Sequence, residues 1–167
     1  MHTRAAADPE TGRWTASAWA IEGIEALPQA HWLHYTLAVA CASRNDFGEL
    51  QEHVEAFTRR TDDPHDLAWI APFDAVLATT DGRDAAAVLA AALSVPGLTT
   101  LERANLHLYD ALMRNLPPAI DPDAARLAVR TATEARLVGL AVTYAFLAMA
   151  LRESDPDGAL AALRRAE

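Results

Sequence analysis

The sequence predicts an all-α protein, built as a stack of about four helix–turn–helix hairpins with one extra N-terminal helix. Three observations carry this prediction. Apolar residues, alanine foremost, make up 51% of the 167 residues, and alanine loses no side-chain entropy in a helix. Asp-Pro pairs, which suit helix starts, recur along the chain. The segment DPDAARLAVRTA at 121–132 returns as DPDGALAALRRA at 155–166, with seven of twelve positions identical.

Helix starts follow from the Asp-Pro pairs at 8–9, 63–64, 121–122 and 155–156. Aspartate accepts hydrogen bonds from the free N–H groups of the first turn, and proline lacks only a donor that this turn does not use. Residues 1–10 are expected to be a flexible N-terminus and residues 11–167 a single helical repeat domain. Between the breaks we predict nine helices, in order: 11–26, 29–44, 46–60, 65–79, 83–94, 99–114, 122–136, 140–152 and 156–166.

The apolar patterns divide these helices into two kinds. Helix 46–60 has a single apolar stripe, which predicts one covered face and one face in water. Helix 29–44 has two stripes and must pack on two sides, and helices 83–94 and 140–152 are apolar almost all round. Helix 122–136 turns Arg and Glu away from its Ala and Leu stripe. The first helix of most pairs is therefore predicted to be the inner one and the second the outer one.

The starts of the predicted outer helices are regularly spaced. Asp46, Asp84, Asp123 and Asp157 lie 38, 39 and 34 residues apart, which is typical of helical hairpin repeats. One hairpin of this size cannot bury its own apolar face, so successive hairpins stack and share a continuous core.

These features resemble the tetratricopeptide repeat family. The segment HYTLAVACASRNDFGELQEHVEAF has the family's spacing, and Ala125 and Ala159 stand where the family prefers a small residue. The resemblance, over about residues 29 to 167, implies a right-handed stack whose inner helices line a concave groove for a peptide or partner helix. The candidate groove residues are Trp32, Tyr35, Trp69, Asn105 and Tyr109.

The helical pattern of the sequence is also similar to that of the helical-repeat region of large bacterial ATP-binding regulators of the LuxR type. That resemblance implies a fragment or a stand-alone relative, because the phosphate-binding and DNA-binding segments of those regulators do not occur here. Helix 11–26 looks like an outer helix without its inner partner, and helix 156–166 ends without a polar capping helix. Such exposed terminal helices would also suit self-association.

Charge and cysteine content restrict the partners and the compartment. A net charge of −9 with scattered basic residues argues against nucleic acid as a ligand of this domain. Cys41 is the single cysteine, so a reducing compartment is expected. The N-terminus lacks the apolar core of a signal peptide, and the apolar run 137–151 is too short to cross a bilayer. A cytoplasmic protein without membrane partners is therefore expected.

Candidate catalytic and metal-binding groups are few. His31 and His34 are three residues apart and His53 lies across the predicted hairpin, an incomplete zinc set for which partly buried, hydrogen-bonded histidines are the better interpretation. The segment DDPHD at 62–66 superficially resembles the aspartate-rich magnesium motif of class I terpene synthases, but it is better explained as a capped helix start.

His107 and Asp110 have the spacing of a hydrogen-bonded pair, yet the sequence places no nucleophile beside them. No Gly-rich phosphate loop, C-x-x-C or G-x-S-x-G motif occurs. We therefore expect a non-catalytic interaction module with no cofactor and no metal. Two alternatives stay open: a domain that senses a small ligand in an apolar cavity, and a small all-α enzyme that uses a His/Asp site.

Overall fold

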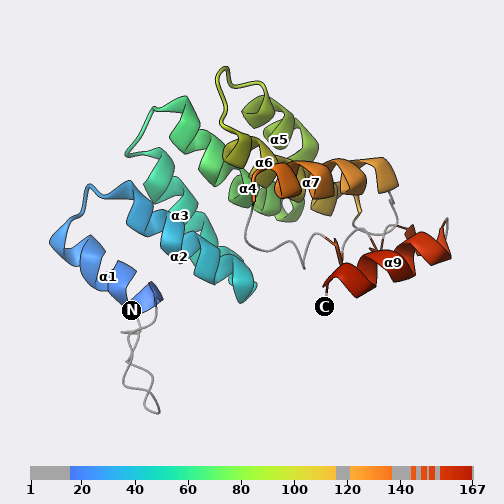
Figure 1. The fold of residues 1–167 in the computed structure, drawn as a ribbon. Helices are drawn as coiled ribbons and strands as arrows, with labels where there is room; N and C mark the ends of the chain where they lie inside the picture. Colours follow the sequence, from blue (N-terminus) through green and yellow to red (C-terminus); the bar gives the residue numbers. More distant parts are fainter. Residues whose placement is uncertain are drawn as a thin grey trace, which may run out of the picture. The chain divides into compact units, whose positions relative to one another are not determined.

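The computed structural model describes residues 16–115, 121–136, 144–145, 148–149, 151–152 and 155–166. Every regular element in these ranges is a helix (Figure 1), which confirms the all-α prediction for them. The flexible segment expected at 1–10 and most of the helix predicted at 140–152 lie outside the described residues. The helices are α1 (Ala16–Ala26), α2 (His31–Ser43), α3 (Phe47–Thr58), α4 (Pro64–Asp81), α5 (Ala85–Leu93), α6 (Thr100–Arg114), α7 (Pro122–Glu134) and α9 (Pro156–Ala166).

Local capping fixes where these helices begin. The Asp46 side chain accepts a hydrogen bond from the Glu49 N–H at 3.2 Å, and Asp84 and Asp121 cap α5 and α7 in the same way. Proline occupies the first position of α4, α7 and α9. Each such cap stabilises a helix by about 0.5 to 2 kcal/mol. The predicted starts therefore agree with the structure to within a few residues, except that the starts predicted at 11 and 140 lie outside the described ranges.

The chain forms two compact units, of which the first, Met1–Arg83, contains α1 to α4. In this unit α2 packs against α1, α3 and α4, and α3 also packs against α4. The prediction that α2 packs on more than one side is thereby confirmed. The one-sided character of α3 is confirmed too, because Leu50, Val54 and Phe57 are buried while Gln51 and Glu55 are exposed.

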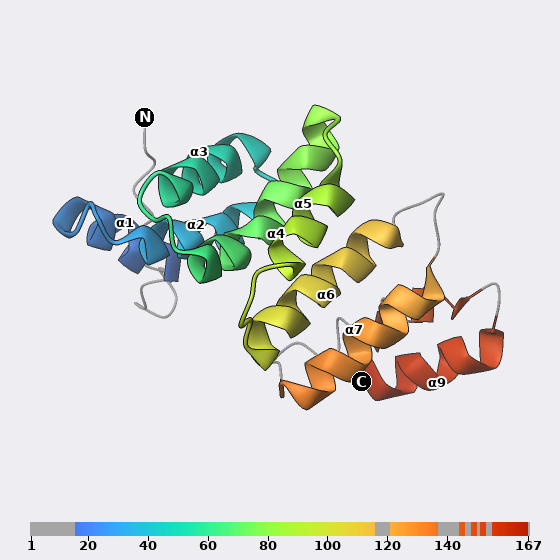
Figure 2. The ribbon, with the colours of Figure 1, turned by 90° about the horizontal axis from the view of Figure 1, so that it is seen from above.

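The second unit, Asp84–Glu167, contains α5, α6, α7 and α9. Helix α6 packs against both α5 and α7, and Figure 2 shows α6 and α7 running side by side. The buried face of α7 is formed by Ala125, Ala128, Thr131 and Ala132, with Arg126 exposed as predicted.

Helix α5 corrects one expectation. Its apolar character all round predicted packing on more than one side, but Leu89 and Ala92 are its only buried residues. Ala86 and Ala90 are exposed. Alanine side chains carry so little apolar surface that leaving them in water costs little, so an alanine-rich helix needs no second partner.

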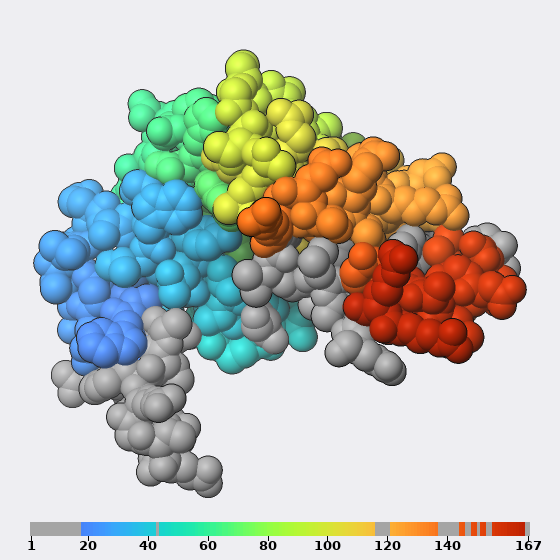
Figure 3. Space-filling view, in the orientation of Figure 1, coloured from blue at the N-terminus to red at the C-terminus, as the bar shows by residue number. Residues whose placement is uncertain are grey.

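Large apolar side chains are exposed on α1 and α9. Trp19 is 63% exposed, and Leu160 and Leu163 are 48% and 49% exposed. In Figure 3, atoms of α9, in red, are visible at the surface that faces the viewer. Within the described part of the chain, no helix combines the length and the hydropathy needed to span a bilayer.

Candidate functional site

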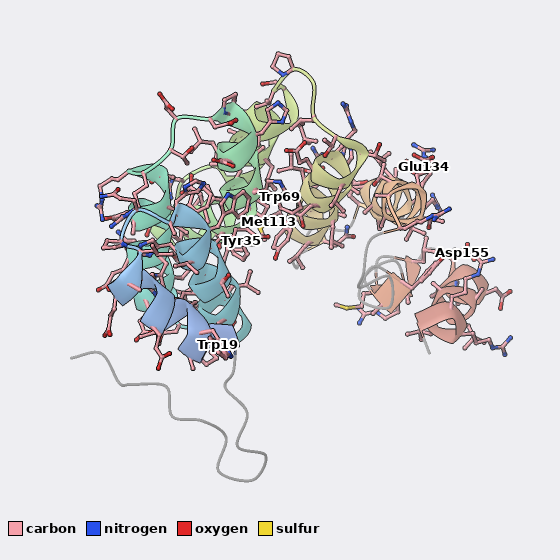
Figure 4. The ribbon with its side chains drawn as sticks, turned by 60° about the vertical axis from the view of Figure 1, so that its left-hand side comes forward. Trp19, Tyr35, Trp69, Met113, Glu134 and Asp155 are labelled. Atoms are coloured by element: carbon pink, nitrogen blue, oxygen red, sulfur yellow. The ribbon has the colours of Figure 1, made fainter. Side chains whose placement is uncertain are left out.

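Three of the predicted groove residues meet in the first unit. Trp32 and Tyr35 project from α2 and Trp69 from α4, and Figure 4 shows Tyr35 and Trp69 beside each other. The ring centroids are 5.4 Å apart for Trp32 and Tyr35, 6.3 Å for Trp32 and Trp69, and 6.1 Å for Tyr35 and Trp69. All three contacts are edge-to-face, the arrangement that the ring quadrupoles favour. We call these three residues the aromatic face.

Two buried phenylalanines form the floor of the aromatic face. Phe57 of α3 is fully buried and its ring lies 5.5 Å from that of Trp32. Phe73 of α4 is 3% exposed and its ring lies 5.6 Å from that of Tyr35. Trp32 itself is 41% exposed, and Tyr35 and Trp69 are partly exposed. The outer rings are thus held in place by the core while they still present surface to solvent.

A polar contact borders the aromatic face where α4 begins. Nε2 of His31 lies 2.9 Å from Oδ2 of Asp66, and the Thr61 hydroxyl donates to the same oxygen at 2.9 Å. The His31 ring lies 5.7 Å from Trp32. The sequence did not single out Asp66 as a partner of His31, because their approach depends on how α2 and α4 pack. The capped start expected for this segment is confirmed, since Asp63 accepts from the His65 N–H at 2.8 Å.

The other two predicted groove residues lie in the second unit. Asn105 and Tyr109 are one helical turn apart on α6, and both are partly buried. Burial raises the pKa of the Tyr109 phenol above its ordinary value. A single groove that joins these two residues to the aromatic face stays a prediction.

His34 and His53 face each other between α2 and α3. Their Nδ1 atoms are 3.3 Å apart, and His34 is only 6% exposed. This confirms the interpretation of these histidines as partly buried, hydrogen-bonded groups. Burial, together with the positive charges of Arg60 and Arg59 and the neighbouring His53, lowers the pKa of His34 to about 4. Among the described residues, no group of three or more His, Cys, Asp or Glu side chains is arranged to hold a metal ion.

This lowered pKa predicts a loss of stability in mild acid. The unfolded chain binds a proton at His34 near pH 6.5, whereas the folded chain resists protonation down to about pH 4. The contribution is therefore fully present above pH 6.5 and declines as the pH falls through this window, by up to about 1.4 kcal/mol per pH unit. Urea unfolding of the wild type and of His34→Leu, measured across this range, should give a shallower pH dependence for the variant. The same pH dependence of the free energy of unfolding in both proteins would contradict the lowered pKa of His34.

The His107–Asp110 pair is not formed in the structure. Asp110 instead accepts a bifurcated hydrogen bond from the Nε–H of Arg114, with its two carboxylate oxygens 3.0 and 2.9 Å from Nε. Burial lowers the pKa of His107, against the opposing influence of Asp110. Cys41 is buried, and burial raises the pKa of its thiol to about 11, so a reactive thiolate is not favoured there.

No protein-family model, curated protein or solved structure matches this chain. The candidate site is therefore defined by the geometry of the aromatic face and its surroundings.

Proposed function

We propose that this chain is a non-catalytic protein-interaction module, similar to tetratricopeptide arrays, and that its aromatic face receives a segment of a partner protein. One observation carries the proposal: two tryptophans and a tyrosine from the two neighbouring helices α2 and α4 form a connected, partly exposed cluster over a buried floor. Tryptophan and tyrosine are the residues most enriched in binding hot spots, along with arginine.

The rigidity of the cluster also supports this role. A side chain that is already immobilised loses little conformational entropy when a partner binds. Trp32, Tyr35 and Trp69 are held by one another and by Phe57 and Phe73, so the aromatic face is preorganised. Under the resemblance to LuxR-type regulators, the partner would be another protein of a bacterial regulatory system.

Peptide display on the full-length chain tests the proposal. Peptides selected from a random library on the wild-type protein should bind Trp32→Ala about 30-fold more weakly, because a hot-spot residue contributes about 2 kcal/mol or more. Affinities would be measured by fluorescence anisotropy, with circular dichroism to establish that the variant is folded.

Trp19→Ala provides the matched control. Trp19 is the more exposed tryptophan and lies on α1, away from the aromatic face (Figure 4), so its removal should leave the affinity within about twofold, as for interface residues outside a hot spot. Selected peptides that bind the wild type and Trp32→Ala equally well would refute the assignment of the aromatic face as the binding surface.

A further inference from the structure

The first unit carries most of the negative charge of the protein. Residues 16–83 contain eleven Asp and Glu residues against four Arg and no Lys, a formal net charge of −7. Residues 84–167 contain ten acidic and eight basic residues, a net charge of −2. The aromatic face thus belongs to the strongly acidic half of the chain.

The four arginines among residues 16–83 are already engaged within the described part of this unit. Arg44 pairs with Glu49, Arg59 with Glu55, and Arg83 with Asp74 at 2.8 Å. Arg60 instead donates hydrogen bonds to two backbone carbonyl oxygens, those of Pro28 and Ala56, at 2.8 and 2.6 Å. The excess of carboxylates is therefore left uncompensated within the described part of the unit.

Part of this excess lies at the start of α4, next in the chain to the polar contact that borders the aromatic face. Asp62 and Asp63 directly follow Thr61, whose hydroxyl holds Asp66 against His31, and the His31 ring contacts Trp32. Asp62 is exposed. An occupant that covers the exposed indole of Trp32 and extends past His31 and Asp66 would meet these carboxylates at the start of α4.

We propose that the occupant of the aromatic face is a basic protein segment, with an arginine stacked on an exposed indole and neighbouring basic residues opposite Asp62 and Asp63. This inference rests on the proposed function and adds the chemistry of the partner. A guanidinium group is planar and weakly hydrated, and it binds the face of tryptophan more favourably than that of the other aromatic residues. The acidic surroundings accelerate the approach of a positively charged partner and repel an acidic one.

Two peptide libraries of opposite charge test the inference on the full-length chain. One random library is enriched in arginine and the other in glutamate, and both are selected on the wild type and then measured against Trp32→Ala. Binders that depend on Trp32 should come from the arginine library. If they come equally from the glutamate library, the basic partner is refuted while the proposed function stands. If neither library yields a Trp32-dependent binder, both the proposed function and the basic partner are refuted.

Charge reversal at the start of α4 supplies a second test. It uses the peptide from the arginine library that binds the wild type most tightly. Asp62→Lys should weaken its binding about fivefold and reduce the dependence of the affinity on salt concentration. Glu52→Lys, the same change at an exposed carboxylate on α3, should alter the affinity less than about twofold. Equal effects of the two reversals would overturn the placement of the basic residues opposite Asp62, because they would show a response to net charge alone.

Discussion

Replacing Phe57 with alanine is expected to lower the free energy of unfolding by about 3 to 5 kcal/mol. Phe57 is fully buried, and its ring contacts His31 at 5.0 Å and Trp32 at 5.5 Å. The substitution removes a large apolar side chain and leaves a cavity under the aromatic face, which the rigid helices around it can close only in part. Urea denaturation followed by circular dichroism measures the loss.

Phe47→Ala is the control for this prediction. Phe47 begins the same helix, α3, but is 38% exposed, so its truncation should cost less than about 1 kcal/mol. Similar losses for the two variants would show that Phe57 is not the buried anchor that the structure assigns.

Leu106→Ala is expected to have the second-largest effect, a loss of about 2 to 5 kcal/mol in the free energy of unfolding. Leu106 is fully buried on α6, the helix that packs against both α5 and α7. Differential scanning calorimetry or urea denaturation of the purified variant provides the measurement.

Leu101→Ala gives the comparison on the same helix. Leu101 is 41% exposed, so the water-exposed part of its side chain contributes little and a small loss is expected. A destabilisation by Leu101→Ala as large as that of Leu106→Ala would contradict the burial pattern of α6.

The helix starts could be predicted from the sequence because capping is local. Asp63, Asp121 and Asp155 each accept a hydrogen bond from an N–H two or three residues further on, so a few adjacent residues decide the boundary. The same reasoning applies to Thr99, which forms a reciprocal capping box with Glu102. That T-x-x-E signal is present in the sequence, although the prediction of the 99–114 helix did not use it.

Contacts between helices could be predicted from the sequence only in part. The alternation of one-sided and two-sided helices predicts the packing of α2 and α3, and the position of Trp32, Tyr35 and Trp69 on predicted inner helices places them in one candidate groove. The roles of Phe57 and Phe73 as a floor, and of Asp66 as the neighbour of His31, depend on the rotation of α3 and α4 against α2. Periodicity specifies which face of a helix is covered, but it does not specify which side chain of a neighbouring helix covers it.

The burial of Cys41 gives the protein a natural reporter of unfolding. The single thiol is 1% exposed, and its pKa is raised to about 11. In the folded state, alkylating reagents and oxidants therefore cannot reach it, and it is not in the reactive thiolate form. Modification of the thiol requires that α2 first separates from its neighbouring helices. The rate of that modification therefore follows local opening of the first unit, without the introduction of any foreign label.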